Sequence, residues 1–411
     1  MTYLEAAVMF RPMFGEQLTT PPDRGERVEI ARAWLSERGD AIAVEQLELA
    51  RIPSPPFGES ERAEAVAAKL REIGAEPELD EIGNVLAWFP ARGDTAIGGA
   101  VIVAAHLDTV FGPDTPIEIR RDAELWKGPG VTDNARGLAV TLAVLRSLVH
   151  AAAKPHQPIL FAYTVGEEGR GDLRGVKHLL RHGSPLHDAT AFIAVDGSGL
   201  RRIVHHALGS RRLRITVSGP GGHSWTDWGR VNPANAIAEF IQRLREIDLP
   251  LDPRTTLTVA RLGGGTSINA IPSESWVELD VRSEANEILR RIELQIRDVL
   301  VSSVAGEQDS TAGSLSAAVE LIGDRPAGKL PIEHPLVQAA YEATRGLGID
   351  PEFAVSSTDA NVAQALGIPA IALGGGGRSG DTHTLNEWFQ DTDGAAGALR
   401  LLYVLSAVAS F

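Results

Sequence analysis

The sequence contains no cysteine in its 411 residues, and this absence excludes several kinds of chemistry. Without cysteine the chain has no disulfide bonds, no thiol nucleophile and no thiolate ligand for a metal ion. Any metal ion that the protein binds must therefore be held by histidine, aspartate or glutamate.

Basic residues and long apolar runs are also scarce. Lysine and arginine number 39 against 54 acidic residues, which gives a formal net charge of −15. Nucleic-acid binding needs clustered basic residues, so this charge argues against such a partner. No apolar run approaches the roughly 18 residues of a membrane span, and we expect no membrane partner. Met1 to Phe10 contains Glu5 and no basic residue, unlike a signal peptide, so we expect a cytoplasmic protein.

The length sets the domain organisation that we expect. A chain of 411 residues is too long for one hydrophobic core, so we expect two or three domains. A content of 44% hydrophobic and 23% charged residues is ordinary for a soluble globular protein. Residues 1–24, which include Pro21-Pro22, are expected to form an N-terminal arm.

The segment that best indicates the fold is Ala100-Val101-Ile102-Val103-Ala104-Ala105-His106-Leu107-Asp108. Its first six residues are small or branched and apolar, which is typical of a strand buried on both faces. His106 and Asp108 are two residues apart, so their side chains leave extended backbone on the same side. Asp108 could then hold one imidazole nitrogen while the other binds a metal ion. Taken alone, such a pair is more often simply two solvated polar residues.

Strands and helices alternate around this segment. We expect strands at 85–89, 159–165 and 191–195, a hairpin over 118–126, and helices over 24–52, 60–73, 135–150 and 173–181. Such alternation produces a doubly wound α/β sheet, in which ligands bind beyond the carboxyl ends of the parallel strands.

Acidic residues follow these strands or begin a helix. Asp133 precedes the helix at 135–150, Glu167 and Glu168 follow one strand, and Asp196 follows another. The ordinary alternatives are a helix N-cap for Asp133 and a solvated acidic turn for the two glutamates. Because all of these residues and His106 fall at one edge of the expected sheet, we favour a functional site over coincidence. Of two adjacent glutamates, one can bind a cation while the other acts as a base.

The pattern changes over residues 209–322. We expect four strands and two helices there, at 211–218, 255–261, 276–281 and 315–322 and over 233–247 and 284–301. This order predicts a ferredoxin-like α+β insert, with an exposed strand or helix that would suit self-association.

The strand-helix rhythm returns after residue 322, so residues 25–208 and 323–411 are expected to form one mixed-sheet α/β domain. A strand at 370–373 enters four glycines, and a helix is expected over 392–408. Gly375 could bring its backbone N–H close to an oxyanion, although a flexible loop is the commoner meaning of such a run.

Eight motifs, taken in order, resemble those of the M20 metallopeptidase family. They are His106-Leu107-Asp108-Thr109-Val110, Gly128-Pro129-Gly130-Val131-Thr132-Asp133-Asn134, Gly166-Glu167-Glu168-Gly169, Asp196-Gly197, Gly219-Pro220-Gly221-Gly222-His223-Ser224, Asn269-Ala270-Ile271-Pro272, Asp280-Val281-Arg282 and His383-Thr384-Leu385-Asn386-Glu387. The resemblance runs from about residue 30 to the end of the chain. It implies a catalytic domain with two zinc ions, interrupted by a dimerisation domain, and therefore a homodimer.

The resemblance also implies a role for each matching residue. The implied metal ligands are His106 and Asp196 for one zinc ion, Glu168 and His383 for the other, and Asp133 as a bridge. Glu167 would be the general base that deprotonates a water molecule shared by the ions, and Asp108 would orient the imidazole of the first ligand. Manganese or cobalt would fit the same oxygen and imidazole donors.

Three residues of the insert match positions that the family associates with the substrate. His223 would reach the active site of the partner subunit and stabilise the oxyanion, whereas Asn269 and Arg282 would contact the substrate. Arg282 would grip a carboxylate, but it could equally pair with Asp280 or Glu278. The other eight histidines match no ligand motif, and we expect them to be surface or structural residues.

The proposed ligands and base do not identify the substrate. A di- or tripeptidase or aminopeptidase is slightly favoured, because Asp133-Asn134 followed by Ala135-Arg136-Gly137 looks more like peptidase-type members than like the deacylases of arginine or lysine biosynthesis. The alternative is a non-peptide amidohydrolase, a deacylase or deaminase acting on an N-acyl amino acid or an aromatic compound. A third hypothesis, a metal-binding dimer without turnover, is disfavoured because a storage site needs no base such as Glu167.

Overall fold

The computed structural model describes residues 24–91, 99–310 and 312–411 of the chain. The chain divides into two compact units. The first unit runs up to Ala207 and resumes at Lys329–Phe411, and the second is Leu208–Gly328. The expected N-terminal arm lies outside the described residues, except for Arg24, which begins the first helix.

A nine-stranded sheet forms the centre of the first unit. Its strands lie in the order β1-β2-β6-β3-β7-β17-β8-β15, and β16 pairs with β8. Their bounds are β1 (Glu78–Leu79), β2 (Val85–Phe89), β3 (Val101–His106), β6 (Ile159–Thr164), β7 (Ala191–Val195), β8 (Arg202–Ala207), β15 (Gly328–Lys329), β16 (Glu352–Ser356) and β17 (Ala370–Leu373). Strands β6, β3, β7 and β17 are mutually parallel, whereas β1, β2 and β8 form antiparallel pairs. The expected mixed α/β sheet is confirmed.

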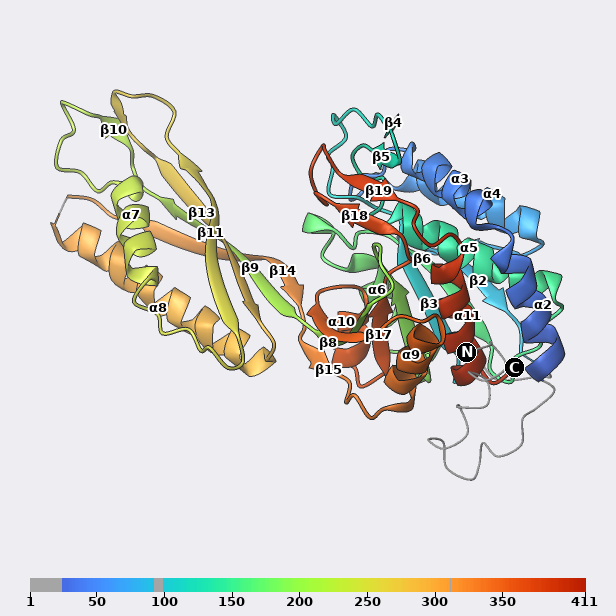
Figure 1. Ribbon diagram of the computed structural model, residues 1–411. Coiled ribbons are helices and arrows are strands. Elements are labelled where there is room, and N and C mark those ends of the chain that lie inside the picture. Colours follow the sequence, from blue (N-terminus) through green and yellow to red (C-terminus); the bar gives the residue numbers. More distant parts are fainter. Residues whose placement is uncertain (1–23, 92–98, 311) are drawn as a thin grey trace. The chain divides into compact units, whose positions relative to one another are not determined.

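Helices cover both faces of this sheet (Figure 1). One face carries α2 (Arg24–Ser36), α3 (Gly39–Ala50), α4 (Ser60–Ile73), α5 (Ala135–His150), α9 (Pro335–Gly346) and α11 (Ala396–Val408). The other face carries α6 (Arg174–Leu179) and α10 (Ala360–Ala365). Two short 3-10 helices span Gly169–Gly171 and Pro185–Asp188. In β3, Val101 and Val103 pack into the first layer and Ile102 and Ala104 into the second, which explains why the whole strand is apolar.

The first helical region differs from the expectation of a single helix over 24–52. The chain instead forms α2 and α3, which are separated at Arg38. A Cβ atom on Gly39 would lie 2.8 Å from the Cα atom of Gly394, so the backbones of two distant segments approach closely there. The break coincides with this close approach, which leaves no room for a side chain at position 39.

A small second sheet of the first unit contains the expected hairpin. Its strand order is β18-β19-β5-β4, and its bounds are β4 (Arg120–Asp122), β5 (Leu125–Lys127), β18 (Arg378–Gly380) and β19 (Trp388–Gln390). Trp388 of β19 pairs with Lys127 of β5. The sheet thereby joins the loop that precedes α5 to the connection between β18 and β19.

The second unit has the expected α+β arrangement. Its antiparallel sheet has the order β11-β13-β9-β14, and α7 and α8 pack on one face of it (Figure 1). The bounds are β9 (Gly209–Ser218), α7 (Pro233–Leu244), β11 (Thr255–Gly264), β13 (Glu274–Ser283), α8 (Asn286–Ser310) and β14 (Ser316–Arg325), with a two-stranded ribbon of β10 (Gly222–His223) and β12 (Ala270–Ile271). The unit continues past the expected boundary at residue 322, because β14 pairs with β9 as far as Arg325.

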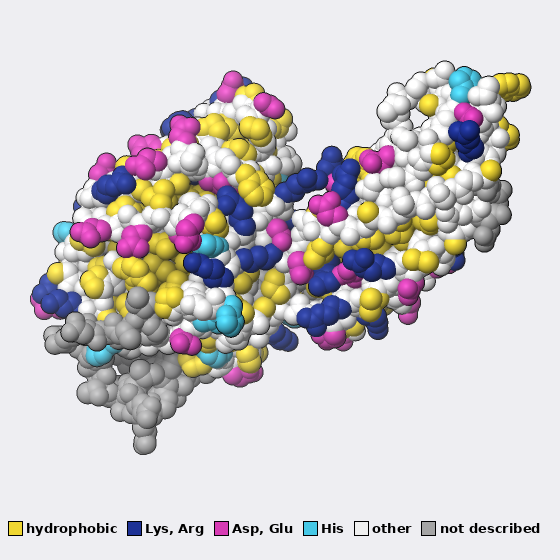
Figure 2. All heavy atoms as spheres, turned by 180° about the vertical axis from the view of Figure 1, so that it is seen from behind, with side chains coloured by type: hydrophobic (Ala, Val, Ile, Leu, Met, Phe, Trp, Pro, Cys, Tyr) yellow, Lys and Arg dark blue, Asp and Glu magenta, His cyan; other side chains and the backbone are white. Residues whose placement is uncertain are grey.

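Apolar side chains remain at the surface of the second unit (Figure 2). On α8, Leu294 and Val301 are 64% and 69% exposed, and Leu321 of β14 is 44% exposed. A groove between α8 and β14 is lined by residues that include Val304 and Val319. Within the part of the chain that the structure describes, no helix is long and apolar enough to cross a membrane.

Candidate metal centre

His106 ends strand β3 and is only 2% exposed. Its Nδ1 atom lies 3.0 Å from the backbone oxygen of Asp108, to which it can donate. In the neutral tautomer that this contact favours, Nε2 carries the lone pair. The Nε2 atom lies 3.0 Å from Asp133 Oδ1 and 3.7 Å from Asp196 Oδ1. Burial opposes protonation, but the surrounding carboxylates raise the pKa of the His106 imidazole well above its ordinary value.

Asp108 makes contacts beyond the expected one with the imidazole of His106. Its backbone carbonyl contacts the His106 ring, whereas its carboxylate Oδ1 lies 3.7 Å from Nδ1. The two carboxylate oxygens instead accept hydrogen bonds from the backbone N–H groups of Glu167 and Glu168, each at 2.8 Å. Asp108 therefore joins the end of β3 to the turn after β6 and fixes the backbone of both glutamates.

Asp133 lies in the loop before α5. The N-cap of that helix is Asn134, whose side-chain oxygen accepts from the N–H of Gly137 at 3.2 Å, and not Asp133. The Asp133 carboxylate lies between two imidazoles, with Oδ1 3.0 Å from His106 Nε2 and Oδ2 3.1 Å from His383 Nε2. Burial alone would raise the pKa of Asp133, but the two imidazoles outweigh it and lower this pKa well below its usual range.

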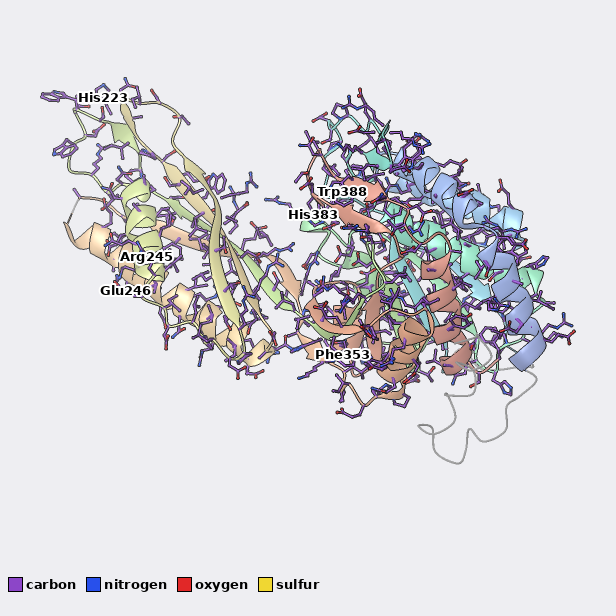
Figure 3. The ribbon with its side chains drawn as sticks, viewed as in Figure 1. His223, Arg245, Glu246, Phe353, His383 and Trp388 are labelled. Carbon is purple, nitrogen blue, oxygen red and sulfur yellow. The ribbon has the colours of Figure 1, made fainter. Side chains whose placement is uncertain are left out.

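His383 approaches the site from the connection between β18 and β19 (Figure 3). Its Nε2 atom is 2.9 Å from Glu168 Oε1 and 3.1 Å from Asp133 Oδ2. Hydrogen bonds with Asp133 and Glu168 raise the pKa of His383 to about 10. Its side chain is 51% exposed, so this imidazole is held by its polar partners rather than by burial.

The five expected ligands form two overlapping groups. Within each group the ligand atoms lie within 4.8 Å of one another, and the groups are His106, Asp133 and Asp196, and Asp133, Glu168 and His383. A third such group contains His106, Glu167 and Glu168. Both glutamates therefore lie at the site, and distance alone does not divide their roles.

The chemistry of these donors suits divalent cations. Two imidazoles share the site with four carboxylates, an excess of negative charge that cations would balance. Asp133 Oδ1 is buried and makes no hydrogen bond of good geometry, although His106 Nε2 lies 3.0 Å away. A buried carboxylate oxygen without a donor is costly unless a cation occupies its lone pair. The residues therefore fit two cations that share Asp133.

Two further acidic residues reach this edge of the sheet. Asp359, just before α10, is 3% exposed and accepts a hydrogen bond from Thr164 Oγ1 at 2.5 Å. Burial raises the pKa of Asp359 to about 6. Glu387 follows His383 in the same connection and is fully buried. The sequence alone assigned a role to neither. Asp359 lies three residues after the short strand β16, and Glu387 ends the motif His383-Thr384-Leu385-Asn386-Glu387, which was the available signal.

The expected substrate-contacting residues lie in the second unit. His223 in β10 pairs with Ala270 in β12, next to Asn269, so the structure brings these two residues together. The Nδ1 atom of His223 accepts from the backbone N–H of Trp225 at 3.1 Å, which places the ring proton on Nε2 in the neutral form. Arg282 Nε donates to Asp280 Oδ2 at 2.8 Å, so the pairing that the sequence left open is present.

The backbone N–H of Gly375 is already used within the chain. It donates to the carbonyl of Gly197 at 2.9 Å, and this arrangement offers no such donor to an oxyanion. A Cβ atom at Gly375 would lie 2.8 Å from Cγ of the buried Arg136. Close packing is therefore the observed reason for glycine at this position.

Comparison with known proteins gives a consistent result. The model of the peptidase family M20/M25/M40 matches residues 102–407. The chain is 26% identical to the cytosol non-specific dipeptidase of Escherichia coli over 64% of this chain, but it spans only 57% of that protein. It is 25% identical to a putative LysW-lysine/LysW-ornithine hydrolase of Pyrobaculum aerophilum, over 79% of this chain and 86% of that protein. The YXEP protein of Bacillus subtilis, described as a dinuclear metal binding peptidase, shares the fold with a TM-score of 0.64 and 18% identity, over 90% of this chain and 99% of that one.

Proposed function

Because the chain belongs to the peptidase family M20/M25/M40, we propose that it is a metal-dependent hydrolase of a small peptide, acting as a di- or tripeptidase or aminopeptidase. The observation that carries this proposal is the pair of ligand groups that share Asp133.

Two divalent ions would bind at these groups. His106 and Asp196 would hold one ion, Glu168 and His383 the other, and Asp133 would lie between them. Zinc suits the imidazole and carboxylate donors, and manganese or cobalt would fit as well. When bound, the ions supply Lewis acidity toward the scissile carbonyl and toward water.

Glu167 is the proposed general base. Its backbone N–H is fixed by Asp108 at 2.8 Å, and its side chain is buried among the ligand groups. Its carboxylate takes a proton from the attacking water molecule and returns it to the nitrogen of the leaving amine. Glu168, whose Oε1 atom contacts His383, is the ligand of the pair.

His223 is the proposed oxyanion donor, acting in the active site of a second copy of the chain. Its Nε2–H is available because Nδ1 accepts from the backbone at Trp225. A neutral imidazole with this proton position is a suitable donor to a developing negative charge. Asn269, just before the neighbouring strand β12, would contact the substrate. Arg282, although paired with Asp280, is proposed to bind a substrate carboxylate.

A homodimer formed through the second unit would supply this second copy. Strand β14 is the last strand in the order β11-β13-β9-β14, so its outer edge has no partner strand among the described residues. Such an edge can pair with an identical strand. Val301 on the neighbouring helix α8 is largely exposed, and a second copy would cover it.

The substrate could instead be a non-peptide amide such as an N-acyl amino acid. The alignment with the putative LysW-lysine/LysW-ornithine hydrolase, which spans 86% of that protein, favours this second candidate. The proposed base and ligands would serve both reactions, so assays must decide between them. Di- and tripeptides and N-acetyl amino acids should therefore be compared on the same zinc-loaded enzyme.

Metal removal tests the proposal directly. Treatment with a strong chelator, followed by dialysis, should abolish hydrolysis, and zinc, cobalt or manganese should restore it. Metal content measured by elemental analysis is the control for both steps. Undiminished hydrolysis by protein shown to be free of metal would contradict the proposed function.

A further inference from the structure

Glu387 is a fully buried acidic residue at the end of the connection that carries His383. A charged side chain is costly to bury unless its oxygens are satisfied by donors. The donors to Glu387 all come from one distant segment, the loop that contains Asp133. No ligand role is available to explain Glu387, because its carboxylate is outside each of the three ligand groups found among the described residues.

The contacts of Glu387 span the whole of this loop. Its Oε1 atom accepts from the backbone N–H of Thr132 at 2.8 Å and of Asp133 at 3.1 Å. Its Oε2 atom accepts from Gly130 at 3.3 Å, and its backbone carbonyl accepts from Gly128 at 2.8 Å. One residue thus makes four hydrogen bonds with the loop.

The hydrogen bonds of Glu387 affect two members of the second ligand group, Asp133 and His383. The bond to the N–H of Asp133 fixes the backbone from which the shared carboxylate projects. His383 is only four residues before Glu387, and half of its side chain is exposed, so it has little apolar packing to hold it. A carboxylate suits this position because its two oxygens can together accept all three backbone N–H groups of the loop.

The first ligand group is supported in another way. His106 ends β3, and the backbone N–H of Asp196 donates to the carbonyl of Leu373 at 2.9 Å, at the end of β17. Both residues are therefore placed by the central parallel strands. Among the five proposed ligands, only His383 comes from the connection that Glu387 ends.

We propose that Glu387 is a positioning residue that holds Asp133 and His383 at the separation required for the cation between Glu168 and His383. This inference rests on the proposed two-metal function and adds a residue that determines the affinity of one site. Loss of the Glu387 carboxylate would weaken most the ion between Glu168 and His383, because both Asp133 and His383 depend on it. The ion at His106 and Asp196 would be weakened less, because it shares only Asp133.

The test is the substitution Glu387→Gln, which keeps the size of the side chain and replaces one oxygen by an NH₂ group. Oε1 could still accept from two N–H groups, but the new NH₂ would face the N–H of Gly130. The dissociation constants of the first and the second zinc ion are measured by competition with a chromophoric chelator. We expect one of the two ions to bind about 10–100-fold more weakly, because this is the usual effect of removing a partner that orients metal ligands.

A second readout does not depend on metal. In metal-free protein, amide hydrogen exchange in a peptide covering residues 128–134 should be faster in Glu387→Gln than in the wild type. The matched control is Asp80→Asn, because Asp80 also receives three backbone N–H groups, from Ile82, Gly83 and Asn84. The control should leave zinc binding and exchange at 128–134 unchanged.

The outcomes separate this inference from the proposed function. Equal weakening of both ions, or unchanged exchange at 128–134, would overturn the role of Glu387. A wild type that binds fewer than two ions would contradict the two-metal function, while the exchange comparison would still decide whether Glu387 holds the loop. If Glu387→Gln does not fold, Glu387→Asp tests the same contacts, because it keeps the charge but withdraws the carboxylate by one methylene group.

Discussion

Replacing Glu167 by glutamine should separate catalysis from metal binding. The substitution keeps the shape of the side chain, and the backbone N–H at this position still donates to Asp108, so the turn stays in place. What is lost is a carboxylate that can accept a proton. General-base removal typically costs about 10²–10⁴-fold in rate, which corresponds to about 3–5 kcal/mol of transition-state stabilisation. We therefore expect a loss of this size in kcat, with little change in KM.

The assay measures hydrolysis of a dipeptide together with zinc content per chain. Glu167→Gln should retain two ions, and the matched variant Glu168→Gln should retain only one tightly bound ion, because Glu168 is the residue that contacts His383. The third ligand group, which contains both glutamates, makes the opposite assignment a real alternative. Loss of an ion from Glu167→Gln, with two ions kept in Glu168→Gln, would refute our reasoning and exchange the two roles.

Two further predictions concern the second unit. His223→Ala should lose about 10²–10³-fold in kcat and retain both ions. Mixing it with Glu167→Ala should restore activity, because a hybrid dimer has one site with both wild-type residues. If activity does not recover after verified subunit exchange, His223 acts in the site of its own chain or has no part in catalysis. Burial opposes ionisation of Glu293, but Arg297 and Arg211 outweigh it and lower the pKa of Glu293 below its ordinary value of 4.5. A lowered carboxylate pKa contributes stability above the unfolded-state value that is lost as pH falls through the folded-state value. We therefore expect the difference in free energy of unfolding between the wild type and Glu293→Gln to become smaller as the pH falls from about 7 to 3, as measured by urea unfolding. A difference that is constant with pH would contradict the pairing of Glu293 with the two arginines.

The central strands could be predicted from sequence because they are buried on both faces. The apolar runs at β3, β6, β7 and β17 are continuous for this reason, and each was found. Strand β8 was not expected, because Arg202, His205 and His206 interrupt its apolar pattern. Its pairing with β16, about 150 residues later in the chain, stabilises it, and such a partner leaves no local signal.

The clustering of the proposed ligands could be predicted for a related reason. His106, Glu168 and Asp196 follow parallel strands, and such strands end at the same edge of a sheet. The contacts of Asp108 and Glu387 could not be predicted, because their acceptor oxygens meet backbone N–H groups of distant loops. Backbone donors carry no residue identity, so no spacing in the sequence reveals them.

The order of the strands has a consequence for synthesis of the chain. Strand β17 lies between β7 and β8, although the whole second unit is made before it. A nascent chain that ends within Leu208–Gly328 therefore holds β7 and β8 without the strand that separates them. The second unit has its own core and can fold while the first waits, because domains generally fold as units. The central sheet cannot be completed until β17 has been made, and His383 follows β17 in the chain.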